Sequence, residues 1–367
     1  MNREDIFYWL ALQKVPGIGD ISAKKLLRNF QSPKEIFEAA KRNAINVPDI
    51  GTYMISQLKN FDEFDRVEDE LKFIEQNQIK ITTIFDQDYP KKLFHAPDGP
   101  ILFFSKGNFN VNNRKVISIV GTRNITAYGR RMVKEIVEGL KAYHPIIVSG
   151  LAYGVDIEAH LSALENDLET IGVLGHGFQR IYPAIHRKIA DKMLQKGGLI
   201  TEFWHTDIVD RNNFLKRNRI VAGMADAVII IESGEKGGAL VTADIANSYN
   251  RDVFAVPGRI SDIYSKGCNN LIKNNQAQLI TSATDIVRFL NWDVQVRQSK
   301  NPQLNLFVDL SDDEQKIFDF LQHNGKTSLD DLSIHLQMPV SKIAQLLLQM
   351  ELNNVIVSLS GKYYEII

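Results

Sequence analysis

The turn GTRNITAYG at 121–129 places Arg123 beside a glycine, directly after the apolar run VISIV. A strand, a glycine turn and a helix N-terminus in that order form a phosphate site, because unpaired backbone N–H groups and the helix dipole point at the anion. Thr126 is of a residue type that caps helices at their N-terminus. We therefore expect Gly121 and Arg123 to face a phosphate, in front of a helix that begins after Thr126.

A second segment of this kind is GGALVT at 237–242, which opens a helix directly after the apolar run DAVIIIE. The backbone N–H groups of Gly237 and Gly238 form a second expected anion site. If both apolar runs are strands of one parallel sheet, the two turns meet at the same edge of that sheet.

A cluster of cations lies in FLKRNRIVAG at 214–223, which contains Lys216, Arg217 and Arg219 with Phe214 beside them. Cations can follow the backbone of a single nucleic-acid strand while an aromatic ring stacks on a base. The alternative is a solvated helix start with a basic face. We favour the nucleic-acid interpretation because the cluster falls at a predicted carboxyl-end loop of the sheet.

Several enzyme and nucleotide signatures are missing or incomplete. The turn at 121–129 does not read G-x-G-x-x-G, GHGFQR at 175–180 lacks the third glycine of that pattern, and ESGEKGGALVT does not match G-x-x-x-x-G-K-[ST]. There is no G-x-S-x-G elbow, and the histidines show no H-E-x-x-H or H-x-H spacing. We therefore expect no cofactor and no metal.

Two groups of carboxylates remain as acid or base candidates. Asp156, Glu158 and His160 fall close together after SGLAYG, although a helix with Asp156 as a cap explains them equally well. Glu202 at the end of an apolar run is the best single candidate. We prefer a structural or hydrogen-bonding role for it, because the sequence shows no partner.

The elements that must position these residues alternate regularly from Lys115 onwards. Apolar runs such as VISIVG, PIIVSG and TIGVLG alternate with amphipathic segments such as MVKEIVEGL and VDIEAHLSAL. This alternation predicts an α/β core at 81–291, a Rossmann-like, doubly wound and mostly parallel sheet with helices on both faces. Its ligand would lie beyond the carboxyl ends of the strands, where Gly121, Gly150 and Gly237 stand.

The first 80 residues are predicted to be an all-helical domain. VPGIGDISAKKLL, with Lys24, Lys25 and Arg28 after its glycine turn, resembles a helix-hairpin-helix (SAM-like) unit that binds a DNA phosphate through backbone N–H groups. A plain helical turn with a glycine C-cap explains it equally well. A second copy, VPDIGTYMISQL, has no basic residues next to its turn, and we favour the plain turn there.

The C-terminal part is predicted to be a linker at 292–310 followed by a winged helix at 311–367. Ser311 and Glu314 form a capping box, two more helices follow, and VIVSLSGKYYEII predicts a hairpin around Ser360-Gly361. The expected recognition helix after Pro339 has Lys342 as its only cation, which argues against strong duplex binding. We interpret this domain as a protein-interaction or regulatory module.

Composition limits the class of protein. The 367 residues predict two or three domains, and a formal net charge of -1 leaves room only for a local basic patch. Cys268 is the only cysteine, so no internal disulfide can form and a reducing cytoplasm is expected. The N-terminus does not resemble a signal peptide, and no apolar run is long enough to cross a membrane.

Six motifs occur in an order typical of one known family: VGTRxxTxYG at 120–129, SGLAYGVDxxAH at 149–160, TIGVLGHGFQRIYP at 170–183, RNRIVAG at 217–223, VFAVPG at 253–258 and GCNNLI at 267–272. Together they resemble the DNA-processing protein A family (DprA, also called Smf). The resemblance is dense from about residue 80 to 290, and the predicted flanking domains fit the longer members of the family.

The resemblance implies a core that binds and protects single-stranded DNA and helps to load the recombinase RecA in natural transformation and recombination. It also implies a homodimer formed through the core and no catalytic activity. Carried onto this sequence, the DNA-facing residues are Gly121, Arg123, Gly150, Lys216, Arg217 and Arg219, with the turn Gly237-Gly238.

Three positions depart from the usual family pattern. Gly237-Gly238-Ala239 stands where Ser-Gly-Ser is usual, so contacts there would use backbone N–H groups. His186 replaces an asparagine after the Tyr-Pro motif, and Leu215 replaces a proline after Phe214. These changes affect single contacts rather than the resemblance as a whole.

Two other functions remain possible from the sequence. Nucleotide-processing enzymes of the phosphoribohydrolase type resemble this core, but they usually have a Pro-Gly-Gly-x-Gly-Thr-x-x-Glu turn, whereas here GGALVT is followed by Ala243-Asp244. A regulator that binds duplex DNA through its winged helix is the third possibility.

Overall fold

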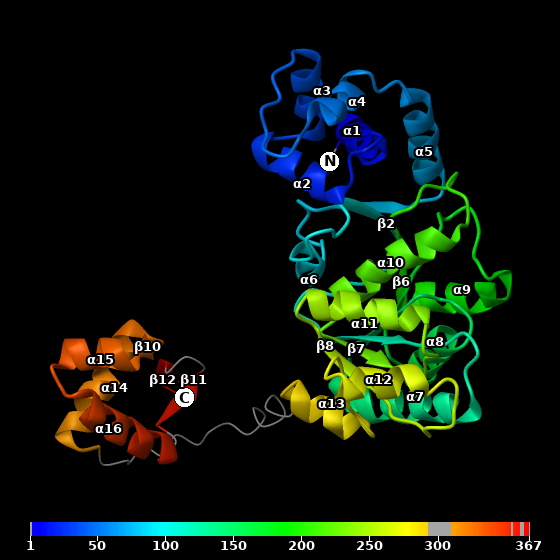
Figure 1. The fold of residues 1–367 in the computed structure, drawn as a ribbon. Helices are drawn as coiled ribbons and strands as arrows, with labels where there is room; N and C mark the ends of the chain where they lie inside the picture. The colour runs from blue at the N-terminus through cyan, green and yellow to red at the C-terminus, as the bar shows by residue number, and fades with distance from the viewer. Residues whose placement is uncertain (1, 293–309, 354, 360–362, 367) are drawn as a thin grey trace. The chain divides into compact units, whose positions relative to one another are not determined.

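The computed structural model describes residues 2–292, 310–353, 355–359 and 363–366 (Figure 1). The chain forms two compact units, Met1–Val294 and Gln295–Ile367. The N-terminal helices and the sheet both belong to the first unit. The boundaries expected at about residues 80, 292 and 311 stay predictions.

A nine-stranded sheet forms the centre of the first unit. Its strands are β1 (Lys80–Thr83), β2 (Leu102–Gly107), β3 (Val116–Val120), β4 (Ile146–Ser149), β5 (Thr170–Val173), β6 (Gly197–Thr201), β7 (Ala227–Ile230), β8 (Asp252–Ala255) and β9 (Gln278–Leu279). Their order is β1-β2-β6-β5-β4-β3-β7-β8-β9, and only the β1–β2 and β2–β6 pairs are antiparallel. The strand order reverses at β3, because β4 lies on one side of it and β7 on the other.

Helices cover both faces of this sheet: α6 (Lys91–Phe94), α7 (Ala127–Leu140), α8 (Val155–Glu165), α9 (Arg187–Gln195), α10 (Arg211–Met224), α11 (Gly238–Ser248), α12 (Lys266–Lys273) and α13 (Ala283–Phe289). The side chains of β3 alternate between the two faces, as the period of a strand requires. Ile117 and Ile119 pack with the apolar side chains of α7, α8 and α13. Val116 and Val120 pack with those of α10 and α11. The predicted doubly wound, mostly parallel α/β core is therefore confirmed.

Residues 80 to 110, which precede the regular alternation of strands and helices, supply two strands of the sheet. The apolar residues ILFF at 101–104 overlap the start of β2, whose first four residues are all buried. β2 pairs antiparallel with β6, and β1 pairs with β2 at the edge. A connection here would have left the edge of β6 unpaired, which costs backbone hydrogen bonds.

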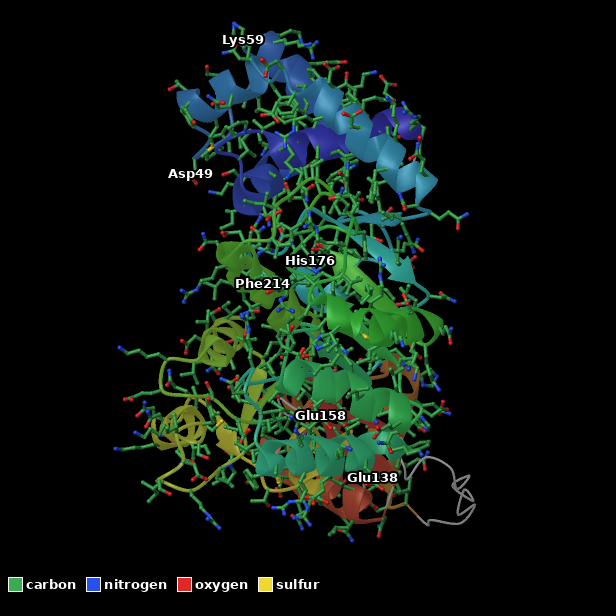
Figure 2. The ribbon with its side chains drawn as sticks, turned by 90° about the vertical axis from the view of Figure 1, so that its right-hand side faces the viewer. Asp49, Lys59, Glu138, Glu158, His176 and Phe214 are labelled. Carbon is green, nitrogen blue, oxygen red and sulfur yellow. The ribbon has the colours of Figure 1, made fainter. Side chains whose placement is uncertain are left out.

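Five helices precede the sheet: α1 (Arg3–Lys14), α2 (Asp20–Asn29), α3 (Pro33–Lys41), α4 (Thr52–Lys59) and α5 (Phe64–Gln76). The two Gly-containing turns expected from the sequence join α1 to α2 and α3 to α4. Figure 2 shows Asp49 and Lys59 in this helical part, above His176 and Phe214 of the sheet region. Its contacts with the sheet region include a hydrogen bond from Trp204 Nε1 to Gln13 Oε1, the ion pair of Lys14 with Asp207, and the contact of Glu70 with His205.

The second unit contains α14 (Asp312–Asn324), β10 (Thr327–Ser328), α15 (Leu329–Leu336), α16 (Val340–Leu352), β11 (Ile356–Leu359) and β12 (Tyr363–Ile366). Its strands form an antiparallel sheet in the order β10-β12-β11. The Ser311–Glu314 capping box is present, as predicted. The expected hairpin turn at Ser360-Gly361 lies outside the described residues. Three helices and a small sheet confirm the predicted winged helix.

No helix in the described part of the chain is both long and apolar enough to cross a membrane.

Candidate nucleic-acid interface

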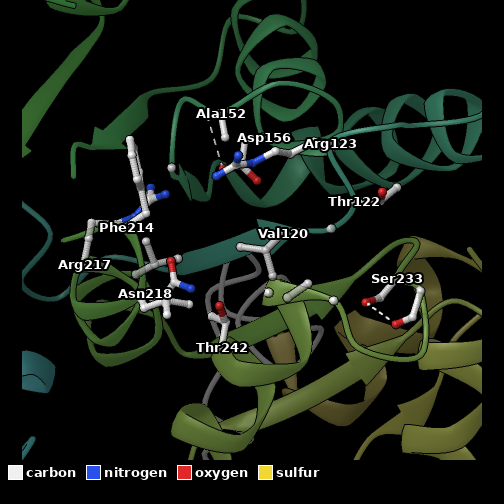
Figure 3. Close-up of a pocket in the computed structure, with 18 of the residues that line it drawn as sticks. Val120, Thr122, Arg123, Ala152, Asp156, Phe214, Arg217, Asn218, Ser233 and Thr242 are labelled. Atoms are coloured by element: carbon white, nitrogen blue, oxygen red, sulfur yellow. Dashed lines mark hydrogen bonds between the residues drawn. The ribbon is translucent and has the colours of Figure 1, made fainter. Parts of the chain in front are cut away.

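A pocket of about 390 Å³ opens at the carboxyl ends of the strands, where the strand order reverses at β3 (Figure 3). This position is the usual ligand crevice of doubly wound sheets. Segments from five places in the sequence line it: the turn after β3, the turn after β4 with the start of α8, one face of α10, the loop after β7 and the start of α11. The lining includes six of the predicted site residues, Gly121, Arg123, Gly150, Arg217, Gly237 and Gly238.

The turn after β3 contributes Arg123 but not a helix N-terminus. Thr126 caps α7 as predicted, since its side chain accepts a hydrogen bond from Gly129 N. The buried carboxylate of Glu232 accepts from Thr126 N at 2.9 Å and from Thr126 Oγ1 at 2.6 Å. The expectation that the start of α7 binds a phosphate is therefore wrong, because a protein carboxylate already occupies that position.

The free N–H groups come from α11 instead. Its N-cap, Gly237, has no side chain to satisfy the first turn of the helix. Within the described residues, the amides of Gly238 and Ala239 have no acceptor, while Leu240 N donates to Gly237 O. These amides border the pocket, so the second predicted anion site has the geometry that helix N-termini use for phosphates.

Arg123 meets an aromatic ring at the mouth of the pocket. Its guanidinium carbon lies 5.7 Å from the centroid of the Phe214 ring, which is within cation–π range. The Tyr182 ring lies 5.9 Å from Phe214 on a tilted plane and is itself exposed. Arg123 is exposed and makes no ion pair with any described residue, so its charge is available to a ligand.

Arg217 forms part of the pocket floor. Its side chain is buried, its Nη1 donates to Val173 O at 2.6 Å, and its Nε has no partner among the described atoms. A methyl group at Gly150 would overlap the guanidinium, so only glycine leaves room for it. Burial raises the pKa of Asp156, and the nearby positive charge of Arg217 opposes that shift. A buried cation with an unpartnered N–H below the pocket provides a counter-charge for an anionic ligand.

The other two predicted cations do not reach this pocket. Arg219 is buried in an ion-pair network, with Nη2 2.6 Å from Glu202 and 3.1 Å from Asp20 of α2. Lys216 lies 3.0 Å from the same Glu202 carboxylate. Glu202 therefore has the structural role expected for it, and the partners that the sequence could not show are Arg219 and Lys216. DNA contacts by Lys216 and Arg219 stay predictions.

Lys24, one of the cations after the first N-terminal glycine turn, is also engaged in hydrogen bonds within the protein. Its Nζ donates to Ala96 O at 2.8 Å and to Pro97 O at 3.3 Å, and burial lowers its pKa to about 8. Lys25 pairs with Asp49 beside the second turn. These cations hold the helices to each other and to the core, which favours the plain structural interpretation of the first turn.

Comparison with known proteins decides the family. Residues 80–291 match the sequence profile of a family described as DNA recombination-mediator protein A, and residues 307–362 match one described as the DprA winged helix domain. The first match alone covers more than half of the chain. The chain belongs to the DNA recombination-mediator protein A family. The resemblance stated from the motifs is thus confirmed.

Individual relatives agree with this assignment. Protein Smf of Synechocystis is 33% identical over 298 residues, which are 79% of this chain and 74% of that protein. The DNA processing protein DprA of Streptococcus pneumoniae is 36% identical over 205 residues, 56% of this chain and 72% of that protein. The X-ray structure of DprA from the same organism superposes with a TM-score of 0.66 and 28% identity, covering 78% of this chain and 98% of that chain.

A structure of DprA from Helicobacter pylori, described as showing a single-stranded DNA binding mode, has a TM-score of 0.53 and 28% identity. It covers 59% of this chain and 97% of that chain.

The three departures from the family pattern find local explanations. His186 is buried, with Nδ1 2.9 Å from Leu151 O, and so ties the loop after the Tyr-Pro motif to the turn after β4. Leu215 is half exposed on the pocket side of α10. Ala239 leaves the start of α11 without a hydroxyl, and the backbone amides there remain open.

Sequence reasoning missed pocket residues on α10. Besides Phe214, which was predicted, the pocket is lined by Arg211, Leu215, Asn218 and Val221. They recur at the three- and four-residue spacing of one helix face. The prediction from FLKRNR was based on cations that are close together in the sequence. A helical projection from Phe214 would have placed Arg211 and Asn218 on the pocket face and Lys216 on another face.

Proposed function

We propose that this chain binds single-stranded DNA in the pocket at β3 and acts in bacterial DNA processing during transformation and recombination. The observation that carries the proposal is the combination of Arg123, the Phe214 ring and the open amides of α11 around one crevice. Cations and amides suit phosphates, and an aromatic ring suits a base whatever its identity. The Helicobacter relative described with single-stranded DNA supports the same assignment.

Within this proposal the strand backbone lies along Arg123 and the start of α11, and a base stacks against Phe214. Arg217 supplies a buried counter-charge below them. Because the ligand contacts are backbone and ring contacts rather than base-edge contacts, we expect little sequence preference and a steep salt dependence.

Further parts of the proposal depend on family membership. We infer that the chain helps to load RecA, works as a homodimer in the cytoplasm and catalyses no reaction. The description of the family as recombination mediators supports the RecA part. The ion pairs of Glu202 support a non-enzymatic role, since they engage one oxygen of the best single carboxylate of the sequence with Lys216 and Arg219.

The deciding experiment is a salt titration of the chain with a labelled oligo-dT and with a duplex of equal length. We expect preferential binding of the single strand, and Arg123→Met should weaken it about tenfold, since a charge-assisted contact contributes roughly 1.5 kcal/mol. The magnitude of the slope of log affinity against log salt concentration should fall by about 0.7, the value for one phosphate contact on a single strand. Equal affinities of the wild type and Arg123→Met at moderate salt would exclude this pocket.

One observation keeps an enzymatic alternative of the phosphoribohydrolase type. Asp156 borders the pocket, and burial raises the pKa of its carboxyl, as in a general acid. Incubation with nucleoside monophosphates, followed by chromatography of the free bases, tests it. Base release that Asp156→Asn abolishes would replace the binding proposal with a catalytic one.

A further inference from the structure

The outward face of α16 does not suit duplex DNA. In a winged helix the second helix of the helix-turn-helix lies in the major groove, and phosphate contacts by cations supply most of the affinity. The exposed residues of α16 are Val340, Ser341, Lys342, Ala344, Gln345, Leu348, Gln349 and Leu352, and only Lys342 among them is charged. The one cation of the helix, Lys342, has its Nζ 2.5 Å from Asp313 Oδ2. The helix that would read bases therefore offers no free positive charge.

Three of these positions form an apolar stripe. Ala344, Leu348 and Leu352 follow one another at four-residue spacing and so lie on one side of the helix. Leu348 is 58% exposed and Leu352 75% exposed, whereas Leu347 on the inner side is fully buried. We call Ala344, Leu348 and Leu352 the α16 stripe. A contiguous exposed apolar patch rimmed by polar residues is typical of a protein contact surface.

Acidic residues stand at both ends of the α16 stripe. The Lys342–Asp313 contact places the acidic first turn of α14, which includes Asp312, beside the start of α16 (Figure 1). Glu351 is next to Leu352 at the other end. Asp312 and Glu351 have no ion pair with any described residue, although Glu351 Oε1 accepts hydrogen bonds from Ser358 N and Ser358 Oγ. The segment 311–367 as a whole carries eight acidic residues against four lysines.

Three partners could cover the α16 stripe: duplex DNA, a second copy of the chain, or a helix of another protein. The acidic residues at its ends favour the last. Duplex DNA is repelled by the acidic residues. A second copy would pair α16 with α16 in an isologous contact, and an antiparallel pair would bring the acids of Asp312 and Glu351 together. An amphipathic helix with apolar residues in its centre and cations near its ends matches both the stripe and its flanks.

We propose that the α16 stripe is the docking face for a basic amphipathic helix of another protein. Apolar side chains of the partner cover Leu348 and Leu352, and its lysines or arginines meet Asp312 and Glu351. This surface belongs to the winged helix alone, so the proposal stands whether or not the pocket at β3 binds DNA.

The test uses the full chain and a fluorescein-labelled synthetic 18-residue peptide of leucine and lysine, with leucines on one helix face. Fluorescence anisotropy should show saturable binding, and the double variant Leu348→Gln/Leu352→Gln should weaken it at least tenfold. Both leucines are exposed, so the melting temperature of the variant should equal that of the wild type. The matched control Ile208→Gln/Ile260→Gln removes two exposed aliphatic side chains from the first unit and should leave the affinity unchanged.

A second pair of measurements tests the charge part. Asp312→Asn/Glu351→Gln should reduce the salt dependence of peptide binding while keeping part of the affinity, because the apolar contact remains. A peptide of identical composition with its leucines scattered around the helix should bind at least tenfold more weakly.

Four results would overturn the proposal. The scattered peptide binding equally well would show mere charge attraction, and unchanged binding by the leucine variant would place the peptide elsewhere. A 20-base-pair duplex that displaces the peptide, and whose own binding is lost in the leucine variant, would make α16 a DNA-reading helix. Sedimentation provides the fourth: if the wild type forms an oligomer, Leu348→Gln/Leu352→Gln dissociates it and the peptide does not, the occupant of the stripe is a second copy of the chain.

Discussion

Two arginines that lie two positions apart on α10 have different environments. Arg217 borders the pocket, whereas Arg219 is enclosed by Glu202 and Asp20. We predict that Arg219→Met lowers the free energy of unfolding by about 3 kcal/mol, because it leaves two carboxylates without their partner. At a temperature where the variant is still folded, its single-strand affinity should stay within about twofold of the wild type. Urea unfolding and anisotropy measure the two quantities, and a tenfold loss of affinity would instead make Arg219 a DNA contact.

A substitution of Gly150 tests whether the position of Arg217 in the pocket floor matters for binding. Gly150→Ala places a methyl group on the Arg217 guanidinium and should break its hydrogen bond to Val173 O. We expect single-strand affinity to fall at least tenfold and stability to fall by about 1–3 kcal/mol, the usual cost of overpacking. Gly51→Ala is the matched control, since nothing lies within 4 Å of the added methyl group and its φ is negative. Normal binding by a folded Gly150→Ala variant would show that the position of Arg217 is unimportant.

At the level of single residues, the sequence predicted the glycines better than the cations. Gly121, Gly150, Gly237 and Gly238 follow strand ends, and strand ends determine their position in the fold. The direction of a long cationic side chain depends on acids from distant elements. Asp20 and Glu202 are far apart in the sequence, so no local pattern shows that they enclose Arg219.

Among the elements, α8 carries a buried histidine that makes stability depend on pH. Thr170 Oγ1 donates to Ile147 O, so His160 Nδ1 must donate to Thr170 Oγ1, and Nε2 is left without a partner. Burial lowers the pKa of His160 to about 3. The unfolded chain binds a proton at this histidine below about pH 6.5 and the folded chain does not, so stability falls on acidification from pH 6.5 towards 3, by about 1.4 kcal/mol per pH unit.

We therefore predict that His160→Asn, which keeps a donor for Thr170, loses less stability between pH 7 and pH 5 than the wild type. The difference between the two losses should be about 2 kcal/mol in urea unfolding curves. Measuring the difference cancels the contribution of His176, whose pKa is also lowered by burial. Parallel curves for the two chains over this range would mean that His160 becomes protonated in the folded state.

Sequence patterns predicted the order of elements, but they did not predict two contacts between elements that are far apart in the sequence. The alternation of apolar runs and amphipathic segments predicted strands β3 to β8 and the helices α7, α8, α9 and α11. The cation cluster at 214–223 was expected at a loop, but it lies inside α10. The same patterns could not show that Glu232, at the end of β7, satisfies the start of α7. Nor could they show that β2 runs antiparallel beside β6, because pairing direction depends on where a connection crosses the sheet.

At the scale of the whole molecule, the two units have separate cores. Leu321, Leu332, Ile343 and Leu347 form a core with side chains of the second unit only, and the pocket at β3 is lined by residues of the first unit only. Separate cores allow separate unfolding, since cooperativity is carried by shared buried contacts. The described structure therefore has two units with separate cores, the first with the proposed strand-binding pocket and the second with the proposed docking face.

This division predicts the effect of a core substitution in the small unit. Leu347→Ala removes a fully buried side chain and should cost about 2–5 kcal/mol, a large fraction of the stability of a domain of some 57 residues. We expect proteolysis to cut the second unit of the variant, while calorimetry still shows the main transition of the first unit and oligo-dT affinity stays unchanged. Binding of the leucine–lysine peptide should be lost at the same time, because the α16 stripe exists only when the small core is formed. A fall in oligo-dT affinity that follows the unfolding of the small unit would instead assign the winged helix a share in holding the strand.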